Sequence, residues 1–265
     1  MKYFGGCDVG STYTKCVIID ETGKMVANTT IRSKINAEIS AKDALTQTIA
    51  QVADLHDIGD LSYLVGTGYG RNKVPQADEN ISEISCHAMG VHVTNPSVKA
   101  IIDIGGQDVK GIAIDADGTV RTFAMNDKCA AGTGRFFEAM ANAFECSLEE
   151  FSNLSLTAKN VIPITAQCTV FAESEVITLV GEGKPRDEIA AGIQQAVAKR
   201  CFVMAKKAGA KDQITLTGGC AKNTGLKRAI EKVLRIQVVE LSTDPQLMGA
   251  LGAAEYARQK GLDQE

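Results

Sequence analysis

Two cysteines in this sequence stand directly before segments with the apolar spacing of a helix, and thiols in that position can hold an anionic group. Cys129 lies in a run of small residues, 125–135, that leads into the periodic segment 136–144. Cys168 stands just before a second helix-like run, 170–177. Because the start of a helix carries unpaired N–H groups and a partial positive charge, it favours anions and thiolates. The alternative is a pair of ordinary buried cysteines, since free cysteine commonly packs as a small hydrophobic residue.

Composition and charge indicate a soluble globular protein with room for one large or two moderate domains. The chain has 265 residues, of which 45% are hydrophobic and 23% charged, and its net charge is −4. No block of like charge points to nucleic acid or to an anionic membrane as a partner. No apolar run reaches the roughly 18–20 residues that span a bilayer, and the N-terminal segment has no signal-peptide core. We therefore expect a cytoplasmic protein.

The cysteine spacing excludes two common kinds of site. In a reducing cytoplasm the cysteines are expected to be free thiols. None of them forms a Cys-x-x-Cys pair, so neither a thioredoxin-like motif nor a zinc ribbon is present. A four-thiolate site within one chain thus has no signature in this sequence. The cysteines are Cys7, Cys16, Cys86, Cys129, Cys146, Cys168, Cys201 and Cys220.

Apolar periodicity predicts an alternation of strands and helices. Strands are predicted at 3–8, 15–20, about 25–31, 61–65, 214–217 and 236–240, with a further hairpin within 100–114. Helices are predicted at 40–55, 83–92, from a helix start at the Gly132-Thr133-Gly134 turn onward, from 169 to about 179, at 185–208, from 224 to about 234, and at 246–259.

The opening hairpin recurs about a hundred residues later, which indicates a duplication. Counted from Asp8 and from Asp103, both copies have Gly at +2, Lys at +7, Asp at +12 and Gly at +15. We therefore predict an α/β fold of two similar domains that face one another. The first is expected to comprise residues 1–96 with the returning helix 246–265, and the second residues 97–245, which carry Cys129 and Cys168.

The two hairpin turns have the residues that bind phosphate. Each joins an acidic residue at the end of a strand to glycines, whose N–H groups can form an anion-binding nest. In the first turn, Ser11 and Thr12 can donate to phosphate oxygens and Lys15 can supply a positive charge. Asp8 and Asp103 are expected to face each other across a cleft and to hold magnesium, mostly through water.

A third glycine turn, Gly218-Gly219, follows a predicted strand and suits a nucleoside lying on backbone. Any one of these turns alone is more typical of an ordinary hairpin, but the three in this order favour a nucleotide triphosphate site. No Walker A pattern exists, and 66–70 lacks the Rossmann spacing.

These motifs resemble those of known ATPases. Residues 8–12, 103–108 and 217–223 resemble the two phosphate motifs and the adenosine motif of the superfamily that contains actin, heat-shock chaperones and the acetate and sugar kinases. Residues 67–71, 84–87, 102–110, 125–136 and 168–176 are similar, more specifically, to the activator (component A) of 2-hydroxyacyl-CoA dehydratases, and this similarity runs essentially end to end. That family includes the ATP-binding subunits of benzoyl-CoA reductase (the BadF/BadG/BcrA/BcrD type).

The resemblance implies a duplicated actin-like fold and a homodimer with one 4Fe–4S cluster at the subunit interface, each chain giving Cys129 and Cys168. It implies an ATPase that takes one electron from ferredoxin or flavodoxin and passes it to an iron–sulfur dehydratase or reductase component. Asp8, Asp103 and Gln107 are the expected catalytic residues. ATP/ADP contacts carry over to Ser11, Thr12, Tyr13, Thr14, Lys15, Gly105, Gly106, Gln107, Gly218, Gly219 and Gln246, with Mg²⁺ at Asp8 and Asp103. Cys220 and Gln167 depart from the family pattern, in which small residues stand at these places.

The implied dimer would supply the four thiolate ligands that such a cluster needs. Two thiolates from each chain make four ligands when a two-fold axis relates the chains. Helix N-termini around an anionic cluster offset its charge. ATP-driven closure of a two-lobed fold would move those helices and shift the potential of the cluster.

Two rival functions stay open at this point. A small-molecule kinase of the same superfamily, such as an N-acetylhexosamine kinase, needs a sugar pocket and a catalytic carboxylate but not the two cysteines. A nucleotide-switched assembly protein without metal is the other. Cys86-His87 is more typical of a helical core position than of metal ligands, Glu173 and Glu175 of a solvated face, and Lys128 of a plain surface lysine.

Overall fold

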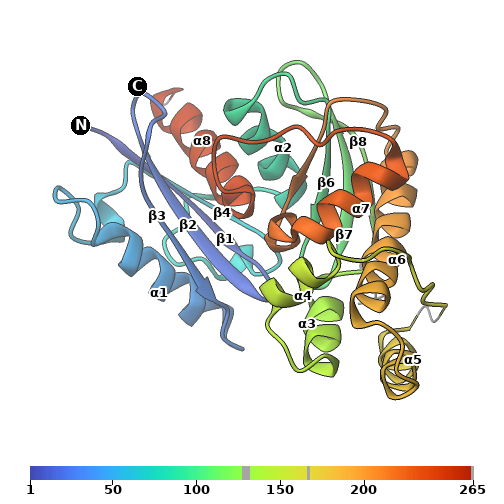
Figure 1. The fold of residues 1–265 in the computed structure, drawn as a ribbon. Helices are drawn as coiled ribbons and strands as arrows, with labels where there is room; N and C mark the ends of the chain where they lie inside the picture. The colour runs from blue at the N-terminus through green and yellow to red at the C-terminus, as the bar shows by residue number, and fades with distance from the viewer. Residues whose placement is uncertain (127–131, 166–167, 264–265) are drawn as a thin grey trace. The chain divides into compact units, whose positions relative to one another are not determined.

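The computed structural model, which describes residues 1–126, 132–165 and 168–263, contains a five-stranded and a four-stranded sheet with helices packed on them (Figure 1). The chain divides into two compact units. The first comprises Met1–Val98, Ile114–Arg121 and Leu241–Glu265, and the second Lys99–Ala113 and Thr122–Glu240. No helix within the described ranges is long and apolar enough to cross a membrane.

The sheet of the first unit has the strand order β3-β2-β1-β4-β5, in which β1 is antiparallel to β2 and parallel to β4. Its strands are β1 (Tyr3–Val9), β2 (Tyr13–Asp20), β3 (Met25–Arg32), β4 (Tyr63–Thr67) and β5 (Glu79–Asn80). Its helices are α1 (Ala37–Ile49), α2 (Glu83–Thr94) and α8 (Met248–Asp263), with short 3₁₀ turns η1 (Ile58–Asp60), η2 (Arg71–Lys73) and η4 (Pro245–Leu247).

Helices cover both faces of this sheet, so every residue of β1 is buried. The side chains of Tyr3, Cys7 and Val9 lie in the hydrophobic core that includes α1. On the opposite face, a methyl group on Gly6 would lie 2.1 Å from the carbonyl oxygen of Ala250 in α8. Only glycine therefore lets α8 approach the strand so closely. Asp8 alternates with Cys7 and Val9 along the strand, so it lies on the α8 face.

The sheet of the second unit has the order β8-β7-β6-β9, with β6 antiparallel to β7 and parallel to β9. Its strands are β6 (Ala100–Ile104), β7 (Val109–Ile114), β8 (Val120–Asn126) and β9 (Ile214–Thr217). Its helices are α3 (Gly134–Ala143), α4 (Leu148–Leu154), α5 (Thr169–Gly181), α6 (Arg186–Lys207) and α7 (Thr224–Leu234), with the 3₁₀ turn η3 (Gly219–Lys222). Four phenylalanines join α3 and α4 in the core: Phe136, Phe137, Phe144 and Phe151.

The two sheets have the same topology. In each, a hairpin is followed by a third strand on its outer side, and a later parallel strand pairs with the first strand of the hairpin. Strands β6, β7, β8 and β9 thus correspond to β1, β2, β3 and β4. The repeated Asp, Gly and Lys spacing therefore reflects a repeated structure, as the sequence predicted.

Several predicted elements differ from the observed ones. Helix α1 begins at Ala37 rather than residue 40, because the side chain of Asn36 caps it by accepting from two backbone N–H groups, and it ends at Ile49 rather than residue 55. Strand β8 and helix α4 were not predicted.

The predicted strand at 236–240 is wrong. This segment makes one backbone hydrogen bond to β9, from Val239 N–H to Ile214 O, whereas the hydroxyl of Thr215 donates to Val239 O. The Val238 N–H donates to the Glu231 carboxylate of α7 instead of to a strand. Side chains therefore take up backbone N–H and C=O groups that the hydrogen-bond ladder of a β-sheet would use.

Candidate functional site

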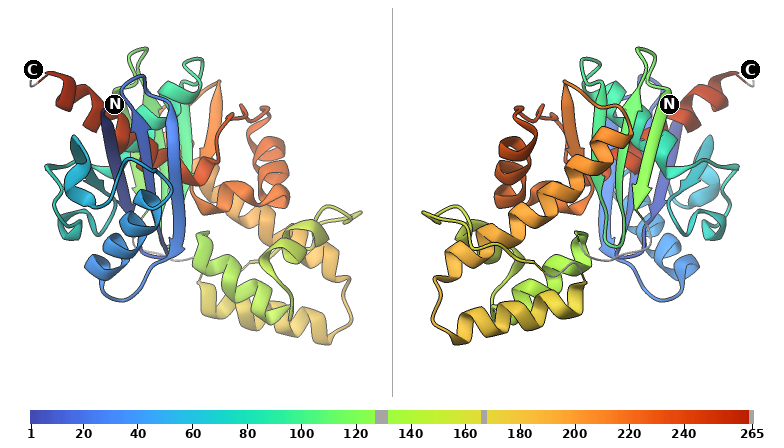
Figure 2. Two further views of the ribbon diagram at one scale, coloured as in Figure 1. Left: turned by 90° about the vertical axis from the view of Figure 1, so that its left-hand side faces the viewer. Right: turned by 90° about the vertical axis from the view of Figure 1, so that its right-hand side faces the viewer.

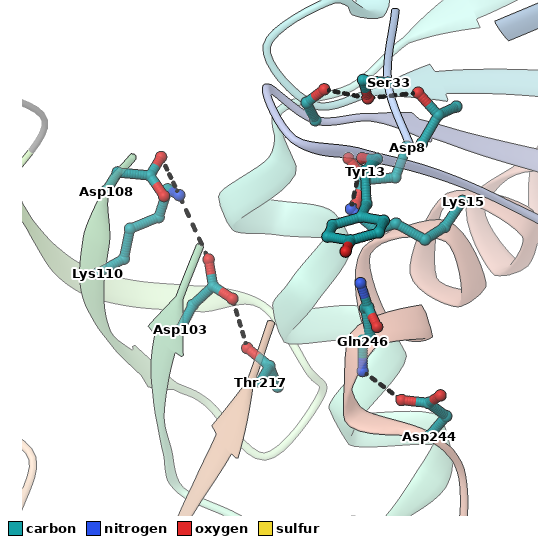
Figure 3. Close-up of polar contacts among 12 residues, drawn as sticks. Asp8, Tyr13, Lys15, Ser33, Asp103, Asp108, Lys110, Thr217, Asp244 and Gln246 are labelled. Carbon is teal, nitrogen blue, oxygen red and sulfur yellow. Dashed lines mark hydrogen bonds and ion pairs between the residues drawn. The ribbon is translucent and has the colours of Figure 1, made fainter. Parts of the chain in front are cut away.

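The first phosphate loop is built around a buried ion pair. Asp8, near the end of β1, lies directly opposite Lys15 on β2, and their side chains form a salt bridge of 2.6 Å (Figure 3). The Lys15 ammonium also donates to the carbonyl oxygen of Tyr13, at 3.4 Å. The carboxylate and the cation at the turn are therefore held together by the strand register.

The turn between these strands offers hydroxyl groups. Ser11 is exposed, while Thr12 is buried and its Oγ1 has no hydrogen-bond partner within the described part of the chain. A buried hydroxyl without a partner is costly, so this atom suits a bound phosphate or ion. Thr14 has another role, because its hydroxyl is hydrogen-bonded to Ser33, which also donates to Gly10 O. Ser33 therefore holds the turn in place.

Helices α2 and α8 bring further groups to Asp8. A methyl group on Gly249 would lie 2.8 Å from Asp8 Oδ2 and 3.0 Å from His87 Nε2, so both groups lie close to the start of α8. Just before α8, the short turn η4 contacts β2 and carries Gln246, which is buried and whose N–H donates to Asp244. The first unit thus places Gln246 and His87 around the same loop as Asp8.

The second phosphate loop repeats this arrangement with an extra carboxylate. Asp103, on β6, lies opposite Lys110 on β7, and the Lys110 ammonium is 3.3 Å from Asp103 and 2.6 Å from Asp108 (Figure 3). Asp103 and Lys110 are each only 3% exposed. Gly105 and Gly106 form the turn between the strands, and Gln107 is exposed at its tip.

A Thr-Gly pair borders the carboxylate in both units. Thr67 and Thr217 are the parallel-strand neighbours of Asp8 and Asp103, and the Thr217 hydroxyl donates to Asp103 at 2.9 Å. Each threonine is followed by a glycine with positive φ, 86° at Gly68 and 83° at Gly218. A methyl group on either glycine would lie within 2.8 Å of the neighbouring aspartate Oδ1, at 2.4 Å for Gly68 and 2.8 Å for Gly218.

Of the two cysteines in the predicted site, the structure describes Cys168. Cys168 is the N-cap of α5, its thiol is exposed, and it makes no side-chain cap hydrogen bond, as expected for a cysteine at a helix mouth. Cys129 lies outside the described residues. Thr133 is the N-cap of α3, so this helix begins where the sequence predicted. The exposed Cys168 thiol fits an iron–sulfur ligand, because thiolates at helix starts are favoured ligands.

Most of the other cysteines are core residues. Burial raises the pKa of Cys86 and of Cys201 to about 12, and it also raises the pKa of Cys16 and Cys220. These thiols stay protonated at neutral pH, which makes them poor metal ligands. Cys86 and His87 are both buried on α2, as the core interpretation predicted. Among the described residues, no three His, Cys, Asp or Glu side chains gather as a metal site.

Some residues of the site were missed by sequence reasoning. Lys110 was noticed only as a repeat position, although its +7 spacing already marked it as the partner of Asp103. The Thr67-Gly68 pair was predicted only as part of the family-like segment 67–71, because its equivalence to Thr217-Gly218 depends on strand pairing. Glu175, expected on a solvated face, accepts hydrogen bonds from the backbone and the hydroxyl of Thr165.

Duplicated hairpins with an Asp–Lys pair at each phosphate loop define an α/β ATPase of actin-like fold, which confirms the predicted fold class. A ROK family glucokinase from Streptomyces griseus shares the fold, with a TM-score of 0.58 at 16% identity over 97% of this chain and 99% of that chain. Residues 6–257 match the model of the BadF/BadG/BcrA/BcrD ATPase family. The chain belongs to this family.

Similar proteins and solved structures include activators of 2-hydroxyacyl-CoA dehydratases. The activator of lactoyl-CoA dehydratase from Anaerotignum propionicum is 44% identical over 255 residues, 96% of this chain and 97% of that protein. Component A of (R)-2-hydroxyglutaryl-CoA dehydratase from Acidaminococcus fermentans has a TM-score of 0.91 at 40% identity, over 99% of this chain and 100% of that chain. The activator of 2-hydroxyisocaproyl-CoA dehydratase from Clostridium difficile, solved with bound ADPNP, also has a TM-score of 0.91 at 40% identity, over 99% of this chain and 96% of that chain.

Proposed function

We propose that this protein is an ATP-dependent activator that delivers single electrons to a 2-hydroxyacyl-CoA dehydratase or a related iron–sulfur reductase. The observation that carries the proposal is the exposed Cys168 thiol at the mouth of α5, in a chain that is 44% identical to a dehydratase activator. The donor is a reduced ferredoxin or flavodoxin. Hydrolysis of ATP to ADP and phosphate supplies the free energy for an unfavourable electron transfer.

In this proposal the loops of both units act on one nucleotide. Asp8 and Asp103 hold Mg²⁺ mostly through water, and Gln107 orients the attacking water. The unpartnered Thr12 hydroxyl and the Lys15 ammonium are directed to phosphate, while Gln246 and the Gly218-Gly219 turn bind the nucleoside. The remaining proposed contacts are made by Ser11, Tyr13, Thr14, Gly105 and Gly106.

Cys129 and Cys168 are proposed to ligate a 4Fe–4S cluster together with the same two residues of a second copy of the chain. Such a cluster, when bound, supplies a one-electron couple. The chain's own contribution is the α5 N-terminus, whose free N–H groups and dipole offset the negative charge of the thiolates. Hydrogen bonds and solvent exposure at the sulfurs tune the potential, and about 59 mV corresponds to about 1.4 kcal/mol for one electron.

Iron analysis of cysteine variants tests the cluster. The protein purified without oxygen is expected to hold about one four-iron cluster per dimer. Replacing Cys129 or Cys168 by Ala removes two of four ligands, so iron and acid-labile sulfide should be lost while ATP binding persists. Cys201→Ala, in a buried core thiol of the same unit, is the control that should keep its iron. Full iron and sulfide in a Cys129→Ala, Cys168→Ala double variant would refute the cluster.

A second assay separates the activator from a kinase. Magnesium-dependent ATP hydrolysis should proceed without sugar and should not be stimulated by hexosamines. The shared fold with glucokinase, at 16% identity, carries no sugar chemistry to this chain. ATP-dependent sugar phosphorylation at an ordinary enzymatic rate would decide for the kinase.

A further inference from the structure

Two cysteines lie directly opposite each other on neighbouring strands of the first sheet. Cys7 and Cys16 are partners in the antiparallel register of β1 and β2, so their side chains project from the same face. Hydrogen-bonded and non-hydrogen-bonded pairs alternate along such a ladder, and the Gly10 N–H donates to Tyr13 O three pairs closer to the turn. The Cys7–Cys16 pair is therefore a non-hydrogen-bonded one, in which facing side chains approach most closely.

The spacing of such a pair permits a disulfide. Cα atoms of a non-hydrogen-bonded pair are about 4.5 Å apart, and disulfides join Cα atoms that are about 4.4–6.8 Å apart, most often about 5.5–6 Å. Cys7 and Cys16 are both free thiols in the structure. Because the starting distance is short, a link would push the two strands apart by about 1 Å, and a strained disulfide is easier to reduce. The bond would therefore form reversibly.

Helix α1 covers the two thiols. Cys7 and Cys16 are fully buried, in the same hydrophobic core as Ala44 and Leu45 of α1. The helix, drawn in blue, packs against β1 and β2 (Figure 2). Burial, and then the neighbouring Cys7 thiol, raise the pKa of Cys16 well above its usual value. A reagent therefore reaches the pair only when α1 opens from the sheet, so the reaction is slow in the folded protein.

The same strands carry the ion pair of the first phosphate loop at the next position. Asp8 follows Cys7 and Lys15 precedes Cys16, and Asp8 and Lys15 are themselves register partners with a salt bridge of 2.6 Å. A change of about 1 Å in the strand separation at the cysteines therefore acts directly on this ion pair.

The duplicated hairpin of the second unit has no such pair of thiols. Ile102, before Asp103, and Gly111, after Lys110, occupy the equivalent places and are register partners. Neither residue can form a disulfide, so oxidation of a hairpin is a property of the first phosphate loop and not of the second.

We propose that Cys7 and Cys16 form a reversible disulfide that acts as a redox-sensitive lock on the first phosphate loop. The oxidant is a low-molecular-weight disulfide. When α1 opens, one cysteine attacks this disulfide, its S–S bond breaks, and a mixed disulfide forms; the other cysteine then displaces the remaining small thiol. One S–S bond forms for the one that breaks. The two cysteines are oxidised by two electrons, the small disulfide is reduced by two, and two protons pass to the two small thiols released.

Peptide mapping of the full-length protein tests the disulfide itself, which does not depend on the proposed function. The protein is kept without oxygen in native buffer and treated with excess oxidised glutathione, and the remaining thiols are then blocked. Trypsin cleaves after Lys2, Lys15 and Lys24, so Cys7 and Cys16 fall in separate peptides, 3–15 and 16–24. These two peptides should be recovered joined, and dithiothreitol should separate them. Recovery of both only as blocked or singly glutathionylated peptides, or a link that forms only in unfolding concentrations of urea, would overturn the proposal.

ATP hydrolysis tests the lock, and this step rests on the proposed function. Since a misplacement of about 1 Å can cost up to about a hundredfold in rate, cross-linked protein should lose about tenfold to a hundredfold in magnesium-dependent hydrolysis and regain it in dithiothreitol. Cys7→Ala and Cys16→Ala should each resist the same treatment. Cys201→Ala, in another fully buried thiol, keeps the pair and should respond as the wild type does.

The outcomes separate the lock from the proposed function. Equal losses in the wild type and in Cys7→Ala, or full hydrolysis by protein that carries the mapped link, would overturn the lock. Absence of hydrolysis from the untreated, reduced protein would instead refute the proposed function, while the joined peptides would still establish the disulfide.

Discussion

The buried ion pair of the second phosphate loop allows the structural role of Asp103 to be separated from its proposed catalytic role. Lys110→Met removes the cation that Asp103 and Asp108 share at 3.3 and 2.6 Å, at a site where the lysine side chain is 4% exposed. Loss of one partner of a buried ion pair typically costs about 3–5 kcal/mol. At about 2–4 °C per kcal/mol for a chain of this size, we expect Tm to fall by roughly 6–20 °C.

Asp103→Asn is the milder change. The amide oxygen can still accept from the Thr217 hydroxyl, and Lys110 keeps Asp108, so we expect a loss of about 1.5–3 kcal/mol, the value of one hydrogen bond to a charged group. In the Asp103→Asn, Lys110→Met double variant the buried charges are removed together, and only Asp108, whose side chain is 30% exposed, keeps a charge. Its Tm should therefore lie above that of Lys110→Met.

The assay combines thermal unfolding with magnesium-dependent ATP hydrolysis. Every variant that carries Asp103→Asn should lack hydrolysis, including the double variant in which stability is recovered. Lys99→Met serves as the control, because its ion pair with Asp212 is exposed on the surface and worth about 0–1 kcal/mol. Normal turnover in the double variant would refute a catalytic role for Asp103, and a Tm of Lys110→Met equal to that of Lys99→Met would refute the buried pair.

Two further predictions concern the same unit. Gly218→Ala should cost more than about 2 kcal/mol and weaken nucleotide binding, because the new methyl group would lie 2.5 Å from Ile104 O at a φ of +83°; calorimetric titration with ADP measures the binding. Gly183→Ala, at φ +75° with nothing within 4 Å, shares only the backbone strain and should leave ADP affinity unchanged. The pKa of Cys201 is raised by burial to about 12 from 9.0, so the folded state retains a proton that the unfolded state loses, and stability present below pH 9 is lost as pH rises towards 12. Urea unfolding between pH 9 and 11 measures how the free energy of unfolding falls with pH. This fall should be less steep in Cys201→Ala than in the wild type, by about 1.4 kcal/mol per pH unit, and equal slopes would contradict this prediction.

The parts of the fold that the sequence predicts are those encoded in short spacings. The Asp-x-Gly pattern with Lys at +7 fixes a hairpin in which aspartate and lysine lie opposite each other, and both copies are observed in that register. The start of α5 was predictable for a similar reason, because the helix-like run begins directly after Cys168.

The parts that escaped prediction depend on contacts between distant segments. The Thr67-Gly68 pair becomes equivalent to Thr217-Gly218 only through parallel pairing with β1 and β6, which no local spacing encodes. The apolar residues of 236–240 have the composition of a strand, but the Glu231 carboxylate and the Thr215 hydroxyl take the hydrogen bonds that a strand requires. Tertiary context thus overrides propensity there.

The duplicated loops differ in how firmly each lysine is held, and this difference bears on their roles. At position +5 from the aspartate, the second copy has the Asp108 carboxylate, while the first has Tyr13, which offers only its backbone carbonyl at 3.4 Å. Lys110 is therefore shared between two carboxylates, and Lys15 is bound by the single carboxylate of Asp8. Because a lysine held by one carboxylate loses less when it turns to a phosphate, Lys15 is the better candidate for contact with the nucleotide. Lys110 is then better suited to hold Asp103 and Asp108 in place, and the fold uses one repeated residue for two purposes.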